Sequence, residues 1–499
     1  MMIDVLLINP GDQREVYQSL AINLTAKEPP IWCRLIASYL RAKSLSVDIL
    51  DAEVYDISPA TVAHVAKMMR ARLIVVVVHG HQPSASTQKM PAATATIKAI
   101  KEELPASPVL VVGAHPAALP WLTLIETGAD FVCLGEGPVT VYELACNLKV
   151  GRPFNSARGL AWLDSGELCA SSIAPNVADL SGEMPGGCWD LLPMRGYRSY
   201  AHHAWSNDFK RQPYASIYTS LGCPYACGFC MIQAPFSLGD QLVLKGRANS
   251  YRMWSADSVM GGITELVEQY GVTNIRFDDE MFVLNESHVI GLCDRIRGRY
   301  DDSLNLWCYG RVDQTKEKFL AKMRQAGFKW LALGIESLST EVRDGVDKGS
   351  YDEVDIIDTV ELIKNHGINI IANYMFGLPG DTLASMRQTL NLALELKTEY
   401  VNMYAAVAFP GSRLWAEKVT AGWKYPENWL AWSFHSYEHV PLGTDTLSPA
   451  EVLRFRDEAF ENYFTDSNYL AYITSRFGRR AVDEVMVMLS HKLERKLLG

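Results

Sequence analysis

Three cysteines lie within eight residues of one another, at Cys223, Cys227 and Cys230 in the segment SLGCPYACGFC. Their spacing, Cys-x3-Cys-x2-Cys, lets three thiolates bind three irons of one cubane [4Fe–4S] cluster and leaves the fourth iron without a protein ligand. An open iron of this kind can chelate the amine and carboxylate of a methionine group. The reduced cluster can then pass an electron to a sulfonium and cleave its C–S bond. The motif therefore predicts a cluster that does chemistry.

A zinc site and three unrelated buried thiols are the alternative interpretations of this motif. A zinc knuckle pairs Cys-x2-Cys with a second pair of ligands further along the chain, and no second pair with that spacing is present. The N-terminus has no basic region of a signal peptide, so we expect a cytoplasmic protein whose other cysteines are reduced. These are Cys33, Cys133, Cys146, Cys169, Cys188, Cys293 and Cys308.

Residues 213–415 alternate between short apolar strands and amphipathic helices, and the cysteine loop follows the first of these strands. Six strand–helix repeats are too few for a closed eight-stranded barrel, so we expect an open, partial (β/α)6 barrel. The predicted strands cover 215–219, 274–277, 305–309, 330–334, 369–375 and 400–408. Polar residues follow several of these strands, and parallel strands would bring them to one rim.

Residues 1–150 show the same alternation. Short continuous apolar strands between helices predict an α/β domain with a doubly wound parallel sheet, which binds ligands at the carboxyl ends of its strands. Residues 151–212 are richer in Gly, Pro and Ser and form a predicted connector with a hairpin around 159–170. Residues 416–499 are helical and form a predicted cap.

The bulk composition restricts the class of protein. Hydrophobic residues make up 48% of the 499 residues and charged residues 21%, as in ordinary globular proteins. No run approaches the roughly 20 apolar residues that span a bilayer. The formal net charge of −10 argues against a large nucleic-acid interface, so we expect no nucleic-acid partner.

The order of these features resembles the cobalamin-binding radical S-adenosylmethionine (SAM) enzymes. The resemblance spans nearly the whole chain. It rests on the cysteine loop, the barrel strand ends and a series of N-terminal turns: Glu28-Pro29-Pro30, Asp51, Val111-Val112-Gly113, Gly135-Glu136-Gly137 and, after the barrel, Pro410-Gly411. The resemblance implies three cofactors, a [4Fe–4S] cluster, SAM and cobalamin.

The resemblance also implies which residues bind SAM. Asp279 and Glu280 correspond to the element that holds the methionine amine, and Glu336 and Ser337 to the segment that contacts ribose and carboxylate. Arg311 is expected to pair with the SAM carboxylate, against the alternative of a structural ion pair. The remaining predicted contacts of SAM are Phe229, Phe376 and Gly377.

The expected cobalamin contacts lie at the strand ends of the first domain: Asn9, Pro10, Gly11, His79, Gly80, Gly113, His115, Gly135, Glu136 and Gly137. Many cobalamin domains carry Asp-x-His-x-x-Gly after the first strand, and its histidine ligates cobalt. The corresponding stretch here begins at Asn9 and has no histidine. His79, His81 and His115 are possible substitutes, although a histidine in such a loop is usually structural. A domain that binds no cobalamin is the alternative.

The resemblance implies a C-methyltransferase. One SAM would methylate cobalamin, a second would yield a 5′-deoxyadenosyl radical, and the substrate radical would take the methyl group. Alternatives are a cobalamin-dependent oxidative cyclase, ring-contraction or hydroxylating enzyme, and a non-catalytic iron–sulfur protein. A methylthiotransferase would need three more clustered cysteines for a second cluster, and no other cysteine cluster appears in the N-terminal part of the sequence. The expected partners are a small-molecule biosynthetic substrate and a low-potential electron donor, flavodoxin or ferredoxin.

Overall fold

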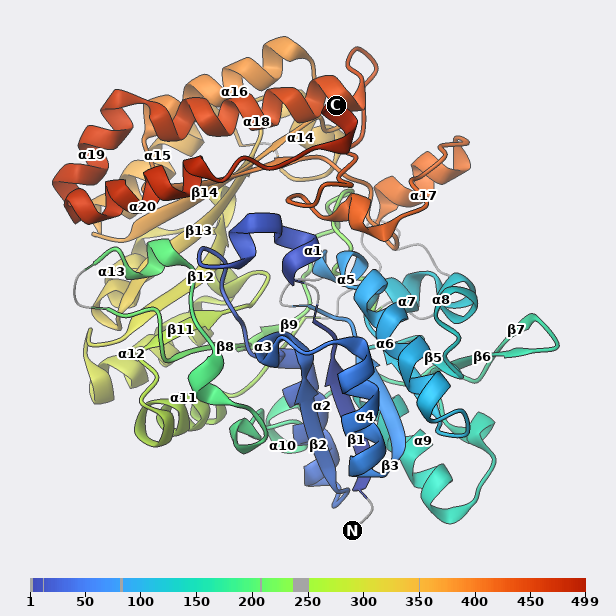
Figure 1. The fold of residues 1–499 in the computed structure, drawn as a ribbon. Coiled ribbons are helices and arrows are strands. Elements are labelled where there is room, and N and C mark those ends of the chain that lie inside the picture. Colours follow the sequence, from blue (N-terminus) through green and yellow to red (C-terminus); the bar gives the residue numbers. More distant parts are fainter. Residues whose placement is uncertain (1–2, 12, 81–83, 207–208, 237–250, 350) are drawn as a thin grey trace.

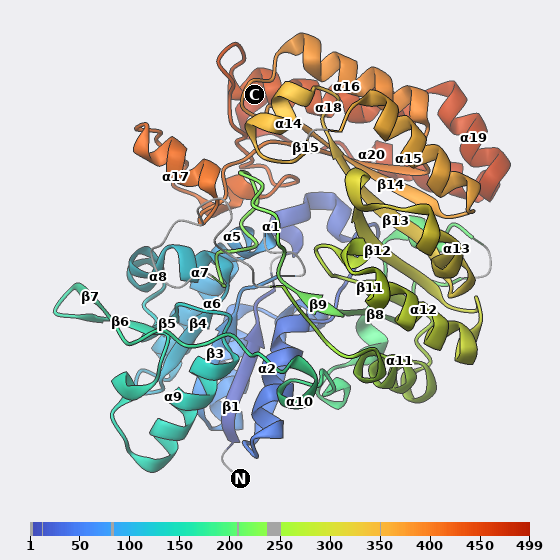
Figure 2. The same ribbon diagram turned by 180° about the vertical axis from the view of Figure 1, so that it is seen from behind.

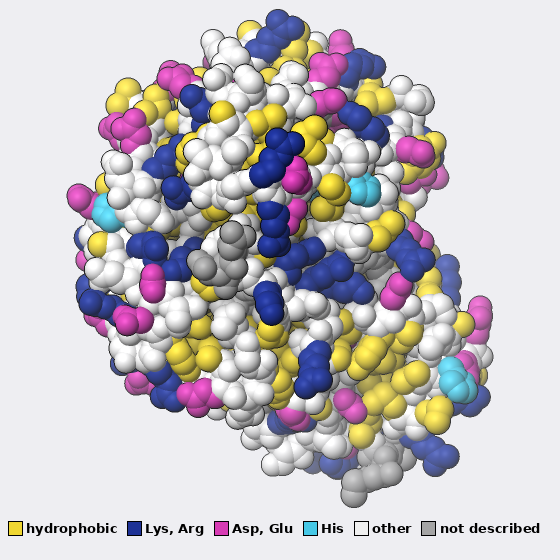
Figure 3. All heavy atoms as spheres, turned by 60° about the vertical axis from the view of Figure 1, so that its left-hand side comes forward, with side chains coloured by type: hydrophobic (Ala, Val, Ile, Leu, Met, Phe, Trp, Pro, Cys, Tyr) yellow, Lys and Arg dark blue, Asp and Glu magenta, His cyan; other side chains and the backbone are white. Residues whose placement is uncertain are grey.

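The computed structural model describes residues 3–11, 13–80, 84–206, 209–236, 251–349 and 351–499. Two sheets dominate the molecule, and Figure 1 shows the first, in blue to cyan, below the second, in green to orange. Figure 2, from behind, shows the same two lobes with the C-terminal helices around the upper one. The space-filling view in Figure 3 shows Lys and Arg side chains gathered in the middle of one face, between the lobes.

The N-terminal sheet has the strand order β2-β1-β3-β4-β5-β6-β7. Its first five strands are parallel, as predicted. The predicted hairpin, β6–β7, pairs antiparallel with β5 and so extends this sheet. The sequence placed it in a separate connector. The strands are β1 Ile3–Asn9, β2 Val47–Asp51, β3 Ala71–Val77, β4 Val109–Val112, β5 Phe131–Cys133, β6 Leu160–Asp164 and β7 Glu167–Ala170.

Helices cover both faces of this sheet because alternate strand residues point to opposite sides. In β1, Val5 and Leu7 face one hydrophobic cluster and Leu6 and Ile8 face another. Helices α2 (Ile31–Ala42) and α9 (Pro138–Val150) pack on the first side, whereas α4 (Pro59–Met69), α6 (Met90–Glu103) and α8 (Pro120–Thr127) pack on the second. The sheet is therefore doubly wound. Its strand order reverses between β1 and β3, where such sheets bind ligands.

The second sheet is an open half-barrel of six parallel strands in the order β15-β14-β13-β12-β11-β8, which confirms the prediction. Its strands are β8 Tyr214–Ile217, β11 Asn274–Phe277, β12 Asn305–Arg311, β13 Phe328–Glu336, β14 Asn369–Phe376 and β15 Tyr400–Ala405. The helices between them are α11 Ala256–Tyr270, α12 Glu286–Tyr300, α13 Glu317–Gln325, α14 Thr340–Gly345, α15 Glu353–Asn365 and α16 Leu383–Leu396.

The C-terminal helices lie along the open edge of the half-barrel. They are α18 Pro449–Thr465, α19 Ser467–Phe477 and α20 Arg479–Ser490. The Tyr463 hydroxyl of α18 donates to the Thr398 carbonyl (2.6 Å), and Arg456 Nε donates to the Met403 carbonyl of β15 (2.6 Å). The predicted C-terminal helices are thus present, and they cover the edge that an incomplete barrel leaves at β15.

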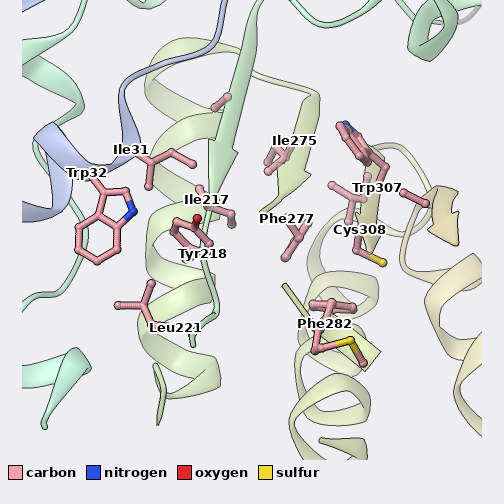
Figure 4. Close-up of a cluster of buried hydrophobic side chains, with 14 of the residues drawn as sticks. Ile31, Trp32, Ile217, Tyr218, Leu221, Ile275, Phe277, Phe282, Trp307 and Cys308 are labelled. Carbon is pink, nitrogen blue, oxygen red and sulfur yellow. The ribbon is translucent and has the colours of Figure 1, made fainter. Parts of the chain in front are cut away.

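The two lobes share one hydrophobic core. Figure 4 shows Trp32 of α2 beside Tyr218, which follows β8, with Phe277 and Trp307 continuing the row across β11 and β12. All four side chains are buried in the same cluster. Continuous packing of this kind fixes the carboxyl ends of both sheets relative to each other. Among the described residues, no helix is both long and apolar enough to cross a membrane.

Candidate functional site

The cysteine loop follows β8 and the short strand β9 (Ser220–Leu221) at the carboxyl end of the half-barrel. Its backbone is fixed on both sides. The Gly228 N–H donates to the Val346 carbonyl (2.7 Å), and the Gly228 carbonyl accepts from the Leu414 N–H (2.8 Å). A Cβ at position 228 would lie 2.7 Å from Arg413 Nη2. A side chain at this position would therefore displace the Arg413 guanidinium.

The three thiols of the loop are reduced and lie close enough to influence one another. Burial raises the pKa of Cys223 to about 12, and the nearby Cys227 contributes. Burial also raises the pKa of Cys230, with further contributions from Cys227 and Cys223. No three His, Cys, Asp or Glu side chains of the described residues converge as ligands of a single ion do. The thiolates of a cubane need no such convergence because they bind three different irons.

Arg311 lies at the end of β12, beside this loop. Its Nη1 contacts Cys227 Sγ at 3.4 Å, and its guanidinium lies 4.0 Å from the centre of the Tyr225 ring. Asp313 accepts from Nε and Nη2 at 2.9 and 3.1 Å. The predicted SAM contact is therefore also an ion pair, and it brings positive charge to a cysteine that would carry negative charge in a cluster.

The two predicted acids after β11 have different environments. Asp279 is fully buried and accepts from the backbone of Thr219 (3.0 Å) and its hydroxyl (2.7 Å), and from the Ser220 hydroxyl (2.5 Å). Asp279 therefore holds the start of the cysteine loop. Glu280 Oε2 has no hydrogen-bond partner among the described residues. Burial and the charge of Asp279 raise the pKa of Glu280, so a cationic ligand would stabilise its ionised form.

Glu336 ends β13 in the left-handed region, with φ of 66°, which L-residues rarely adopt. Its Oε1 accepts from Lys348 Nζ at 2.7 Å, and both side chains are about nine-tenths buried. Burial alone would lower the pKa of Lys348, but the charges of Glu336, Tyr351 and Cys227 together outweigh burial and raise it. Strained, paired groups of this kind occur at functional sites. Sequence reasoning missed Lys348 because its only signal is its tertiary partner.

The other predicted SAM residues contribute differently. The Ser337 hydroxyl is fully buried and accepts from the Ser339 N–H at 3.2 Å, which shapes the turn after β13. Phe376 is buried against Phe455, with ring centres 5.1 Å apart. Gly377 has φ of 81° and donates to Asp381 at 3.0 Å. The Phe376 carbonyl accepts from the Ala406 N–H at 2.8 Å, so these backbone groups, like the Phe376 ring, are bonded within the protein.

Polar side chains at the β1/β3 switch point of the N-terminal sheet form a buried network. Lys89 Nζ pairs with Glu53 Oε2 at 2.7 Å and donates to Asn9 Oδ1 and the Pro10 carbonyl at 3.3 and 3.2 Å. Asn9 in turn donates to Asp51 at 2.7 Å. The predicted residues Asn9 and Pro10 are thus at this rim, and Lys89 and Glu53 are additions that the sequence did not indicate.

Two of the three histidines considered lie at the same rim, and His81 lies outside the described residues. His79 stacks on Trp32 with ring centres 4.1 Å apart, and His115 lies edge-on to Trp429 at 4.5 Å. Both are buried, both have an Nε2 without a hydrogen-bond partner among the described residues, and burial lowers the pKa of each to about 3. They are neutral near pH 7. Gly80 follows with φ of 67°.

The predicted glycines of the N-terminal rim have different surroundings. A Cβ at Gly113 would lie 2.6 Å from Val78 Cγ2, and one at Gly137, which has φ of 115°, would lie 2.7 Å from Val112 Cγ1. Among the described residues, a Cβ at Gly135 would meet only the Pro235 carbonyl, at 4.0 Å. Gly135 is therefore a position where a ligand could approach the backbone.

Two predicted residues of this rim have structural contacts. Glu136 is buried and pairs with Arg252 at 2.7 Å. A Cβ at Gly11 would lie 3.0 Å from the Ala52 carbonyl, so this glycine permits the close approach of the chain after β1 to α3 (Ala52–Tyr55).

A cavity of about 310 Å³ lies between the two lobes. The N-terminal lobe contributes the segment around Tyr17–Thr25 and Ala85–Gln88. The half-barrel contributes side chains from β11, β12 and β15, among them Arg276, Tyr309 and Tyr404. Arg276 is fully buried, pairs with Glu28 and Asp278, and donates to the Tyr309 hydroxyl (2.5 Å). This network joins Glu28 to a residue 248 positions away, which sequence pattern does not reveal.

Comparison with known proteins agrees with this arrangement. The B12 binding domain family matches residues 17–145, and the Radical SAM superfamily matches residues 217–393. The chain is a cobalamin-binding radical SAM enzyme. The predicted family and its three cofactors are confirmed. The free thiols on one loop, the charged rim around them and the accessible backbone at Gly135 fit the cluster, SAM and cobalamin, respectively.

Individual relatives of this cobalamin-binding radical SAM enzyme cover most of its length. An uncharacterized methyltransferase of Pyrococcus horikoshii is 26% identical over 80% of this chain and 81% of its own. An anaerobic magnesium-protoporphyrin IX monomethyl ester cyclase of Rubrivivax gelatinosus is 24% identical over 94% and 78%. A similar solved structure is that of the radical SAM methyltransferase TsrM from Kitasatospora setae with cobalamin and [4Fe–4S] cluster bound. The TM-score is 0.64 and the sequence identity is 20%, and the match covers 84% of this chain and 74% of TsrM.

Proposed function

We propose that this enzyme transfers a methyl group from SAM to an unactivated carbon of a small-molecule substrate. The observation that carries the proposal is the cavity that both lobes line, because methyl transfer to a substrate radical requires two cofactors to reach one substrate. The names of the methyltransferases from Pyrococcus and Kitasatospora support it. When bound, the cluster with SAM supplies a radical that removes hydrogen from carbon, and cobalamin carries the methyl group.

The side chains of this enzyme then have defined tasks. Cys223, Cys227 and Cys230 hold the cluster, and the Glu280 carboxylate accepts hydrogen bonds from the methionine amine of SAM. The Arg311 guanidinium, which lies beside Cys227, binds the SAM carboxylate. Aromatic walls such as Trp307 and Tyr400 keep water out of the cavity and so protect a reactive radical.

A substrate-free experiment tests the proposal. The enzyme is loaded anaerobically with iron, sulfide and cobalamin, reduced with titanium(III) citrate and given SAM with a deuterated methyl group. We expect S-adenosylhomocysteine and a cobalamin that carries the deuterated methyl group, both measured by mass spectrometry. The triple Cys→Ala variant should lose 5′-deoxyadenosine, because no cluster is left to reduce SAM. Formation of 5′-deoxyadenosine with no S-adenosylhomocysteine would contradict methyl transfer.

That contradictory result would instead favour a second candidate, an oxidative cyclase, ring-contraction or hydroxylating enzyme. The similarity to the Rubrivivax cyclase over 94% of this chain favours it over a non-catalytic iron–sulfur protein. A low-potential donor, flavodoxin or ferredoxin, is part of either proposal because the cluster must be reduced. The division into residues 1–150, 151–212, 213–415 and 416–499 remains a prediction, as does the cytoplasmic location.

A further inference from the structure

One wall of the cavity carries an arginine that is only partly satisfied by the protein. Arg456 of α18 is 7% exposed and lines the cavity. Its Nε donates to the Met403 carbonyl at 2.6 Å, and its Nη1 donates to Asp457 Oδ1 at 2.8 Å. No hydrogen-bond partner of Nη2 is present in the described part of the chain. A buried guanidinium with spare donors is a site for an anion.

The charge around Arg456 is not balanced. Asp457 is shared with Arg495, whose Nε and Nη2 each lie 3.0 Å from a carboxylate oxygen, so two guanidinium groups face one carboxylate. Glu461 also lines the cavity, but it pairs with Lys492 at 2.8 Å. His435 in the same wall is neutral, because burial and then the charges of Arg456 and Arg495 lower its pKa to about 3. One positive charge is left over.

The opposite wall of the cavity differs in charge. Arg276 is there, but Glu28 and Asp278 both pair with it. The ring contacts of the two arginines are alike, because the Arg276 guanidinium lies 4.6 Å from the centre of the Trp307 ring and that of Arg456 lies 4.9 Å from the centre of the Phe460 ring. The two carboxylates beside Arg276 make the difference. Arg276 therefore does not attract an additional anion. The cavity lining also includes several aromatic side chains, among them Tyr309, Tyr400, Tyr404, Phe434 and Phe460.

We infer that the substrate is a small molecule with a flat apolar or aromatic body and one carboxylate, and that Arg456 binds the carboxylate. The inference rests on the proposed function in that it takes this cavity as the substrate site. The volume of about 310 Å³ is at the lower end of the range for ligand pockets. It suits a molecule of one or two rings. Arg456 would hold the anion at the α18 wall and direct the body toward the half-barrel strands.

A matched pair of probes tests the inference without turnover. Binding of 2-naphthylacetate and of the neutral 2-naphthylacetamide to the cobalamin-loaded enzyme is measured by isothermal titration calorimetry. We expect the carboxylate to bind about tenfold or more tighter, as for a charge-assisted hydrogen bond in a buried site. If the unmodified protein binds the two probes with equal affinity, or binds neither, the inference is overturned.

Variants then assign the preference to one side chain. R456M should abolish the preference for the carboxylate, whereas R456K should keep part of it because the charge remains. R454M is the matched control, since Arg454 is exposed on the same helix. Thermal unfolding and cobalamin retention show whether R456M is folded, and R456K gives the answer if it is not. A preference unchanged in both Arg456 variants would place the anion elsewhere and overturn the inference.

The two proposals can fail separately. Probe binding needs neither a reduced cluster nor SAM, whereas formation of S-adenosylhomocysteine needs no substrate. Loss of the carboxylate preference with normal methylation of cobalamin would overturn only the substrate class. The reverse result would leave an anion-selective cavity in an enzyme that does not transfer methyl groups.

Discussion

The carboxyl ends of the two parallel sheets form two rims that differ in their buried polar groups. At the N-terminal rim Lys89 is paired with Glu53. The Nε2 atoms of the neutral histidines His79 and His115 have no hydrogen-bond partner in the part of the chain that the structure describes. At the half-barrel rim Glu280 has a carboxylate oxygen without a partner among the described residues. The same strand-end geometry thus suits a large cofactor on one side and a charged amino-acid sulfonium on the other.

The strongest test of this division removes the cluster ligands. Cys223→Ala should reduce cluster iron and 5′-deoxyadenosine formation to background, because two thiolates cannot hold a cubane securely. Binding of cobalamin, measured from its absorption spectrum after desalting, should remain at the wild-type level. Cys293→Ala, a buried thiol of α12, is the matched control and should retain the cluster. Loss of cobalamin together with iron would show that the rims are not independent.

The next prediction separates the two neighbouring acids of the half-barrel rim. Glu280→Gln should weaken SAM binding about tenfold while iron content stays normal, since it removes one charge-assisted contact with the amine. Asp279→Asn should instead lower iron content, because Asp279 anchors Thr219 and Ser220 at the start of the cysteine loop. Equilibrium binding of SAM and iron analysis measure the two effects. The assignment is reversed if Asp279→Asn changes SAM affinity alone.

This contrast also shows how far the sequence could be interpreted. Apolar periodicity records which faces are buried, so it predicted the strand 274–277 with the bounds that the structure has. The cysteine spacing, being local, predicted the loop. Periodicity does not record what a side chain meets across a sheet. Neither the Glu28–Arg276 pair nor the orientation of Asp279 toward Thr219 could be predicted, because both depend on tertiary contacts.

A smaller effect is expected from protonation at the N-terminal rim. His79 has a pKa of about 3 in the folded protein against about 6.5 when unfolded, so between these values only the unfolded chain binds a proton. Its contribution to stability is therefore complete above pH 6.5 and is lost as the pH falls, by up to about 1.4 kcal/mol per pH unit. H79F, which keeps an aromatic ring against Trp32, should make the free energy of unfolding less sensitive to pH by that amount.

Urea unfolding at pH 6.5, 5.5 and 4.5 measures this change. H64F is the control because His64 is exposed on α4, and its unfolding should keep the wild-type pH dependence. Other buried histidines, such as His115 and His439, maintain part of the slope in every variant. An H79F slope equal to that of the wild type would mean that His79 is charged or exposed in the folded protein.

The smallest expected effect distinguishes Gly113, where a side chain would overlap the protein itself, from Gly135, where a side chain would lie against bound cobalamin. Gly113→Ala should destabilise the apoprotein by about 1–3 kcal/mol, because the added Cβ would overlap Val78. Gly135→Ala should leave the free energy of unfolding of the apoprotein unchanged within about 0.5 kcal/mol. Cobalamin affinity should respond differently, falling several-fold in Gly135→Ala because a methyl group then separates the ligand from the backbone. Thermal unfolding of the apoprotein and titration with hydroxocobalamin measure the two quantities. Normal cobalamin affinity in Gly135→Ala would place the cofactor away from the β5 end of the rim, nearer the switch point between β1 and β3.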